Sequence, residues 1–174
     1  MQQNIEALQS AKPNFITLNS AKKYLRVNHI HDDEMIKDML DVVCAMAENY
    51  IGIKLSVASW KISIHGNLPS RIKLLKAPIN KIESFKIYKN NGEISYLSKD
   101  HYDLYENYIW MKRGYITEKS EIIYSVGYKV EELPAPIKQG MLEHLAKIYD
   151  MRGSDQALPL SAKSLYQPYK IVRF

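Results

Sequence analysis

The sequence predicts an α+β fold in which the N- and C-terminal helices form a helical core, with an antiparallel β-sheet or small barrel inserted between them. Two observations lead to this prediction. Apolar residues recur at helical spacing near both ends of the chain, and in the middle they alternate with polar residues at the period of a strand. Several short strands in succession favour an antiparallel arrangement over a parallel α/β sheet.

Two helices are predicted near the N-terminus. Thr17 is a suitable N-cap for a short helix that runs to Arg26, because its hydroxyl can accept a backbone N–H of the first turn. Asp32 or Asp33 is expected to cap a longer helix, and Gly52 to end it in a left-handed conformation. The apolar stripe of this longer helix recurs every three or four residues and consists of Ile36, Met39, Leu40, Val43, Ala47, Tyr50 and Ile51.

Strand patterns occupy the middle of the chain. From Ala58 to Ile64 apolar residues alternate with polar ones, which is the period of a half-buried strand. Asn91-Gly92 is typical of a tight hairpin turn, and Gly114 and Gly127 are expected to break strands. The expected strands are Ala58–Ile64, Arg71–Leu75, one that contains Phe85 and Ile87, Glu93–Leu97, Tyr108–Met111 and Glu121–Val126.

A further helix and an apolar ending follow the strands. Pro136 suits the first turn of this helix, and Gly153 is expected to close it. Ser161 is a candidate cap for one more turn, which Pro168 would stop. Apolar content normally falls at the end of a chain, but here it continues to Phe174. We therefore expect this ending to be buried, either by its own domain or by a neighbouring subunit.

The length of 174 residues fits a single domain. No apolar run is long enough to span a bilayer, and the N-terminus lacks the layout of a signal peptide, so no membrane association is expected. The expected organisation is a flexible N-terminal arm (residues 1–15) and one domain (16–174) that contains helices (17–52), a β insert (58–126), a helix (135–152) and a C-terminal tail (158–174).

The composition gives little support for a chemical activity. The net charge of +5 comes mainly from lysines spread along the chain, and abundant Lys, Ile, Asn and Tyr is what an AT-rich genome imposes on any protein. The single cysteine, Cys44, excludes an internal disulfide and indicates a reducing compartment. It lies in a strongly periodic helix, so we expect a buried, inert thiol.

Two polar clusters of the sequence are candidate sites. His29 and His31, with the adjacent Asp32 and Asp33, contain metal-binding side chains, but helix capping accounts for the aspartates more simply. The segment Asp100–Asp103 could supply acid–base groups around His101 of a small hydrolase, but no nucleophile can be assigned to it, and a polar turn is the simpler interpretation. We therefore predict no catalytic residues, no cofactor and no metal site.

A small nucleic-acid-binding module is the alternative hypothesis. Tyr108 and Trp110 precede Lys112 and Arg113, a combination that can stack bases and neutralise phosphates. In a strand, however, Tyr108, Trp110 and Lys112 share one face while Arg113 points away. The sequence thus predicts aromatic side chains on this strand without a basic rim around them.

Several segments together resemble the phage head–tail connector (head-completion adaptor) family of tailed phages and gene transfer agents. The resemblance covers residues 16–174 and rests on the order and spacing of these segments. They are Ile16–Val27 followed by His31–Ile36, Glu48–Gly52 with the Trp60 strand after it, Tyr124–Tyr128, Leu133–Gln139 and Leu165–Phe174.

The resemblance implies a structural role. Proteins of this family form a ring, commonly twelve-fold, beneath the portal protein, where they extend the DNA channel and present a platform to the tail or to the next completion protein. The resemblance also implies that the protein catalyses no reaction and that DNA passes through the lumen of the ring without sequence-specific binding. Isolated subunits of such proteins can be monomeric. The resemblance further implies a place in the virion neck, after assembly in the cytoplasm of a bacterial host.

The C-terminal tail is the predicted interface with the portal or a neighbouring subunit. A closed ring requires two different patches on each subunit, and an apolar tail is a suitable donor. We expect that deletion of residues 167–174 leaves a folded domain that cannot join the portal. The predicted interface residues are Leu158, Pro159, Leu160, Leu165, Tyr166, Pro168, Tyr169, Ile171, Arg173 and Phe174.

Overall fold

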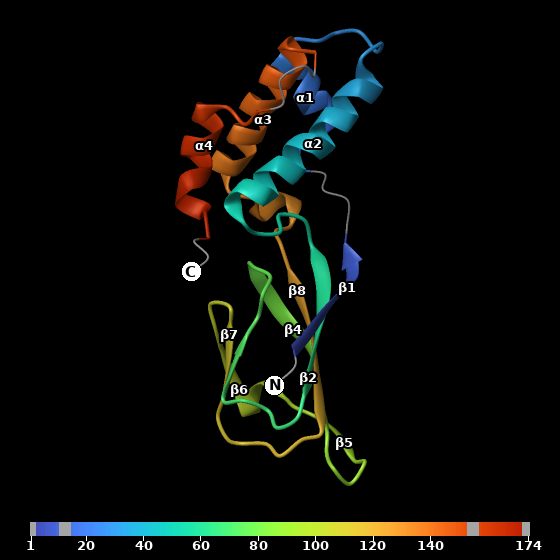
Figure 1. Cartoon of the computed structure of the whole chain (residues 1–174). Helices are drawn as coiled ribbons and strands as arrows, with labels where there is room; N and C mark the ends of the chain where they lie inside the picture. The colour runs from blue at the N-terminus through green and yellow to red at the C-terminus, as the bar shows by residue number, and fades with distance from the viewer. Residues whose placement is uncertain (1–2, 11–14, 153–156, 172–174) are drawn as a thin grey trace. The chain divides into compact units, whose positions relative to one another are not determined.

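The computed structural model describes residues 3–10, 15–152 and 157–171 of the chain. The chain divides into two compact units, a β unit and a helical unit, each assembled from segments far apart in the sequence (Figure 1). The β unit comprises Met1–Ala11 and Ser56–Gly127, and the helical unit comprises Lys12–Leu55 and Tyr128–Phe174.

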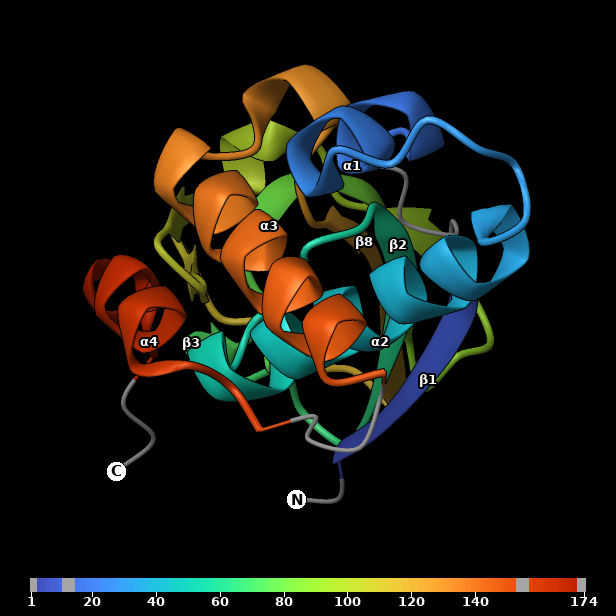
Figure 2. The same cartoon turned by 90° about the horizontal axis from the view of Figure 1, so that it is seen from above.

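Four α-helices form the helical unit. In the views of Figures 1 and 2, α3 lies between α2 and α4. Within the described residues, no helix combines the length and apolar content that crossing a membrane requires. The helices are α1 (Leu18–Leu25), α2 (Asp33–Ile51), α3 (Ala135–Asp150) and α4 (Leu160–Tyr166), with 3-10 turns η2 (Val130–Glu132) and η3 (Gln167–Tyr169).

The ends of α1 and α2 largely follow the sequence. The Thr17 side chain accepts a hydrogen bond from the Ser20 N–H, and Gly52 ends α2 with a φ of +84°. Asp32 stands at the N-cap position of α2, but its side chain makes no capping hydrogen bond, because it accepts one from the Tyr149 hydroxyl of α3 instead. An inter-helix contact has therefore replaced the expected local cap.

Apolar faces of α2 and α3 form the core of the helical unit. The predicted stripe of α2 is confirmed in large part, since Ile36, Val43 and Ile51 are completely buried. The facing residues of α3 include Ile137 and Leu145, also completely buried. Burial of this kind stabilises each side chain by about 1.5–3 kcal/mol, so the packing of α2 against α3 accounts for much of the stability of the unit.

Two antiparallel sheets form the β unit. A five-stranded sheet has the order β1-β2-β8-β4-β5, and a three-stranded sheet has the order β3-β7-β6. Both have open edges in the described residues, so the insert consists of sheets and not of a closed barrel. The strands are β1 (Gln3–Ser10), β2 (Ala58–His65), β3 (Arg71–Lys73), β4 (Ile79–Tyr88), β5 (Ile94–Tyr96), β6 (Tyr102–Tyr105), β7 (Tyr108–Met111) and β8 (Lys119–Val126), with the 3-10 turn η1 (Lys99–His101) before β6.

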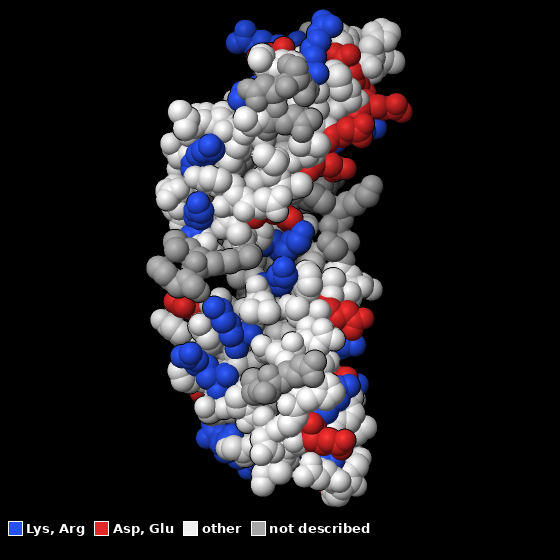
Figure 3. Space-filling model, in the orientation of Figure 1, with Lys and Arg blue, Asp and Glu red and all other residues white. Residues whose placement is uncertain are grey.

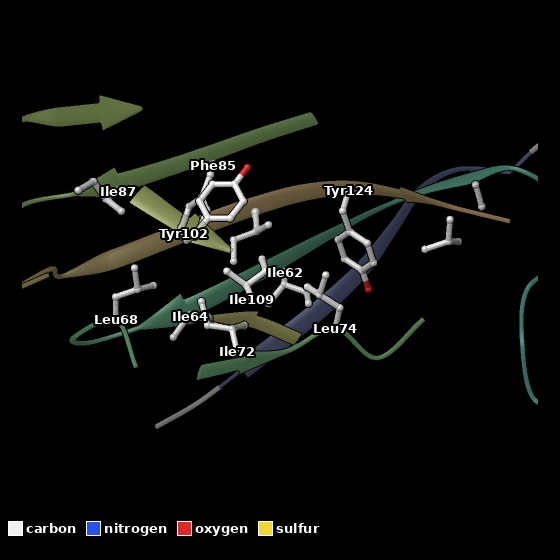
Figure 4. Packing of buried hydrophobic residues seen from close by; sticks show 13 residues of the cluster. Ile62, Ile64, Leu68, Ile72, Leu74, Phe85, Ile87, Tyr102, Ile109 and Tyr124 are labelled. Atoms are coloured by element: carbon white, nitrogen blue, oxygen red, sulfur yellow. The ribbon is translucent and has the colours of Figure 1, made fainter. Parts of the chain in front are cut away.

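The inward faces of the two sheets share one apolar cluster (Figure 4). Ile62 of β2 and Ile122 of β8 come from the large sheet, and Ile72 of β3 and Ile109 of β7 from the small one; all are 1% exposed or less. The alternation predicted from Ala58 onward is confirmed, since Ala58, Ile62 and Ile64 are buried. Burial on the inward face therefore sets the register of these strands.

The N-terminal residues differ from the expected flexible arm. Gln3–Ser10 form β1, which pairs antiparallel with β2 and places Ile5 opposite Ile62. Among the side chains of this strand that the structure describes, Ile5 alone packs partly against the apolar cluster. A single apolar contact leaves no alternating pattern in the sequence, so the strand depends on backbone pairing with a distant partner.

Several local predictions are confirmed, and others need correction. The Asn91-Gly92 hairpin joins β4 to β5, with Gly92 at a φ of +80°. Ser161 does not cap α4, which already begins at Leu160 after Pro159. The predicted helix end at Gly153 lies outside the described residues.

Candidate functional site

The C-terminal segment, the predicted interface, packs on the helical unit through α4. α4 contacts α3 and α2, and its buried residues are Ala162 and Tyr166. Leu158, just before the helix, is also buried. Ala162 and Tyr166 are one turn apart on α4, so they line the face of the helix that meets the rest of the unit, and Leu158 adds a buried side chain before it. The apolar ending is thus partly covered by its own domain.

Tyr166 anchors the segment against the backbone of α3. Its side chain is completely buried, and the ring lies over Gly140, where a Cβ atom would be 2.5 Å from its Cε1 atom. The ring of Tyr50 from α2 lies 6.1 Å away, centroid to centroid. Burial, followed by the nearby Cys44 and Glu143, raises the pKa of the Tyr166 hydroxyl. Gly140 is therefore the position that allows α4 to approach α3 closely.

We expect Tyr166→Phe to leave the free energy of unfolding unchanged or to raise it by up to about 1 kcal/mol. The Tyr166 hydroxyl is buried and has no hydrogen-bond partner among the described residues. Removing an unsatisfied polar group while keeping the ring relieves a desolvation cost. Urea denaturation of the two proteins measures the difference. A loss of more than about 1 kcal/mol would show that the hydroxyl makes a stabilising contact.

The residues after α4 are held by the C-terminal end of α2. The Tyr50 hydroxyl donates a hydrogen bond of 3.2 Å to Gln167 Oε1, and Lys170 Nζ lies 4.6 Å from the centroid of the Tyr50 ring. The Ile171 N–H donates to the Ile51 carbonyl at 2.9 Å. These contacts hold the segment on the unit up to residue 171, while leaving part of its apolar surface in solvent.

The ten predicted interface residues thus fall into distinct groups. Leu158 and Tyr166 are buried within the helical unit, whereas Leu160 is 79% exposed and Ile171 is 36% exposed. Pro168 is exposed; Pro159, Leu165 and Tyr169 are half-buried; Arg173 and Phe174 lie outside the described residues. We use the name C-terminal surface for the solvent-facing described residues, which are Pro159, Leu160, Leu165, Pro168, Tyr169 and Ile171.

A hollow adjoins the start of this surface. It has a volume of about 670 Å³ and lies between α1, α3 and the residues around Pro159. Tyr24, Glu143, Lys147 and Met151 are among its lining residues. The hollow combines charged and apolar side chains, as partner-binding surfaces commonly do. The sequence offered no indication of it, because its lining residues come from three separate segments.

The polar clusters of the sequence have structural roles. Asp32 accepts the hydrogen bond from Tyr149, Asp33 pairs with Lys22, and His29 Nε2 lies 3.7 Å from Asp32. His101 Nδ1 contacts the Ser98 hydroxyl at 3.0 Å in η1. Among the described residues, no group of three or more His, Cys, Asp or Glu side chains is arranged to hold a metal ion.

Cys44 is buried, as predicted. Only 2% of the residue is exposed, and burial, followed by the nearby Glu48, raises the pKa of its thiol to about 12. The thiolate is the reactive form of cysteine, and it is strongly disfavoured at neutral pH with such a pKa. Cys44 therefore fills space between helices.

Comparison with known proteins identifies a common fold. A chain described as part of the neck of an empty GTA particle with C6 symmetry matches with a TM-score of 0.74 and 16% identity, over 98% of this chain and 97% of that one. A chain from the virion of a native gene transfer agent matches with a TM-score of 0.73 and 15% identity, over 98% and 96%. A chain from the native GTA neck with C12 symmetry gives a TM-score of 0.63 and 15% identity, over 96% and 97%.

These matches show that the chain shares its fold with chains from gene transfer agent particles. The sequence profile of the family described as "Phage gp6-like head-tail connector protein" matches residues 15–101, which is half of the chain. The chain belongs to this family of phage connectors. A comparison with curated proteins gives no significant match.

Proposed function

We propose that the protein is a head–tail adaptor that forms a ring beneath the portal in the virion neck, extends the DNA channel and provides the platform for the tail or the next completion protein. The observation that carries the proposal is the family match over residues 15–101. It is supported by the fold, which recurs over nearly the whole length of chains from GTA necks with C6 and C12 symmetry.

The proposal includes a mode of action through binding surfaces alone. No catalysis is required, and DNA passes through the lumen without sequence-specific binding. Residues 16–174 act together as one connector domain, assembled in the host cytoplasm. The direct test is incubation with the portal protein of the same phage or particle, followed by electron microscopy. Rings at the portal vertex that persist at high salt support the proposal. A DNA affinity that falls steeply with salt, without portal binding, favours the nucleic-acid-binding alternative.

We propose further that the C-terminal surface contacts the portal or the neighbouring subunit. Its apolar side chains are held in place by the packing of Leu158 and Tyr166 beneath them and by the contacts to α2. Such a surface loses little conformational freedom on binding, because its backbone is already ordered. Arg173 and Phe174 extend this proposed interface beyond the described residues.

We predict that deletion of residues 167–174 and the substitution Leu160→Gln each weaken portal binding and leave the domain folded. Burial of one leucine at an interface contributes about 1.5–3 kcal/mol, so Leu160→Gln should weaken binding by about 10-fold or more. Leu160 is 79% exposed in the free protein, so its replacement should not affect stability. Binding to immobilised portal and circular dichroism measure the two properties.

Ile30→Gln is the matched control for this prediction. Ile30 is 75% exposed and lies in the same helical unit, in the turn before α2. We expect its replacement to leave portal binding unchanged. If the protein that lacks residues 167–174 is unfolded, the C-terminal segment is part of the core and not an interface. If the deletion, Leu160→Gln and Ile30→Gln all bind portal equally well, the C-terminal surface is not part of the portal interface.

A further inference from the structure

The outer face of the three-stranded sheet combines exposed aromatic and basic side chains. Strand pairing places Arg71 of β3 opposite Trp110 of β7, and Lys73 opposite Tyr108. On the other side of β7, Tyr105 of β6 pairs with Tyr108. Paired residues point to the same side of a sheet. We call Arg71, Lys73, Tyr105, Tyr108 and Trp110 the aromatic–basic face.

Contacts within this face hold its side chains in position. The Arg71 guanidinium lies 4.8 Å from the Tyr108 ring centroid and 5.4 Å from that of Trp110. Even so, Trp110 is 44% exposed and Tyr105 is 68% exposed. Trp, Tyr and Arg are the residues most enriched at energetically important positions of protein interfaces. The face is therefore a preformed candidate for contact with a protein partner.

An acid-rimmed hollow lies on the helical unit. It has a volume of about 500 Å³, and its floor includes the apolar residues Met39, Val42 and Ile148. Glu34 and Asp38, one turn apart on α2, supply carboxylates at its rim. The other lining residues are His31 and Met35. Figure 3 shows acidic side chains along the part of the helical unit where α2 lies, and basic ones over the part of the β unit where β6 and β7 lie.

We propose that the aromatic–basic face of one copy docks into the acid-rimmed hollow of the next copy, with Trp110 in the hollow and Arg71 and Lys73 against Glu34 and Asp38. The inference rests on the proposed ring, whose neighbouring subunits must meet through two different patches. Both halves of the contact are present on every copy of this chain. Their charges are opposite, and methionine sulfur makes favourable contacts with aromatic rings.

A neighbouring copy fits the face better than DNA does. Asp103 pairs with Trp110 in the register of β6 and β7, so its carboxylate belongs to the same side of the sheet, where it forms an ion pair of 3.2 Å with Lys112. Phosphate neutralisation dominates nucleic-acid affinity, and this carboxylate weakens it, whereas docking into the hollow also draws on the apolar burial of Trp110. The acid-rimmed hollow complements the aromatic–basic face both in its apolar centre and in the opposite charge of its rim.

Zero-length carbodiimide cross-linking of mixed isotopic copies tests the contact directly. Unlabelled and ¹⁵N-labelled full-length proteins are mixed at high concentration, free and on portal, and cross-linked peptides are identified by mass spectrometry. We expect mixed-isotope links from Lys73 to Glu34 or Asp38. The links should be lost in Trp110→Ala, which keeps all the charges of the face. Links confined to one isotope, or no link between the two surfaces in either sample, overturn the inference.

Charge exchange supplies a second test. Arg71→Glu with Lys73→Glu should abolish these contacts and assembly on the portal, and Glu34→Lys with Asp38→Lys in the same chain should restore assembly. Lys86→Glu with Lys89→Glu, on β4 and just after it, is the control and should assemble normally. Normal rings from the Arg71 and Lys73 variant overturn this inference but leave the proposed function intact. Failure of the unmodified protein to assemble on portal instead contradicts the proposed function.

Discussion

Gly127→Ala should destabilise the β unit by about 3 kcal/mol or more, the sum of backbone strain and a clash. Gly127 has a φ of +94°, a conformation that costs a residue with a Cβ atom about 1–2 kcal/mol. A Cβ atom at this position would also lie 2.2 Å from the Ser56 carbonyl oxygen. The Gly127 N–H donates to the Pro78 carbonyl at 2.9 Å, so main chain confines the residue on both sides.

Gly66→Ala separates the two contributions. Gly66 has a similar φ of +90°, but a Cβ atom there would have no neighbour within 4 Å. We therefore expect only the strain, about 1–2 kcal/mol, at this position. Urea denaturation followed by circular dichroism measures both variants. If Gly66→Ala and Gly127→Ala lower the free energy of unfolding by the same amount, the main chain near Ser56 moves to accommodate the new methyl group without further destabilisation.

Gly140→Ala should weaken the docking of α4, although it raises helix propensity. Replacing glycine by alanine inside a helix normally stabilises it by about 1 kcal/mol. Here the added methyl would lie 2.5 Å from Tyr166 Cε1 and 2.9 Å from its Cζ. The ring is completely buried, so it must move against packed neighbours, and overpacking of this kind costs about 1–3 kcal/mol. We expect a net loss of stability and weaker portal binding.

The sign of this effect should reverse when the ring is absent. The Tyr166→Ala substitution by itself should lower the free energy of unfolding by about 3–5 kcal/mol. In that background, the added methyl group at position 140 has no aromatic ring to clash with. Gly140→Ala should then stabilise the protein by up to about 1 kcal/mol. A double-mutant cycle in urea provides the comparison. If Gly140→Ala changes the free energy of unfolding in the same direction in both backgrounds, the Tyr166 ring does not pack against Gly140 as described.

The family and most of the elements could be predicted from the sequence. Local spacing is enough to place α2, because a stripe such as Ile36 to Ile51 buries one continuous face. The hairpin at Asn91-Gly92 follows from the preference of its turn for glycine at positive φ. The resemblance to phage connectors, based on the order of such segments, is confirmed by the family match.

The sequence alone defines the predicted C-terminal interface only in part. The apolar content of the segment does not tell which side chains face inward, and Leu160 and Tyr166 are equally plausible from composition. The structure separates them, because Tyr166 fits over Gly140 whereas Leu160 meets no such surface. β1 was missed for a related reason, since its stability depends on pairing with β2 and not on its own pattern.

Local physics therefore determined most of the helices, strands and turns, with β1 as an exception, because those choices depend on neighbours a few positions away. The partners of each segment depend on contacts between distant residues, and only the tertiary structure decided them. The aromatic–basic face shows the difference. Around Trp110 the sequence predicts no basic rim, yet strand pairing brings Arg71 across from it on β3. The register of strand pairing places residues from distant parts of the sequence side by side, and so it determines which side chains form a common surface.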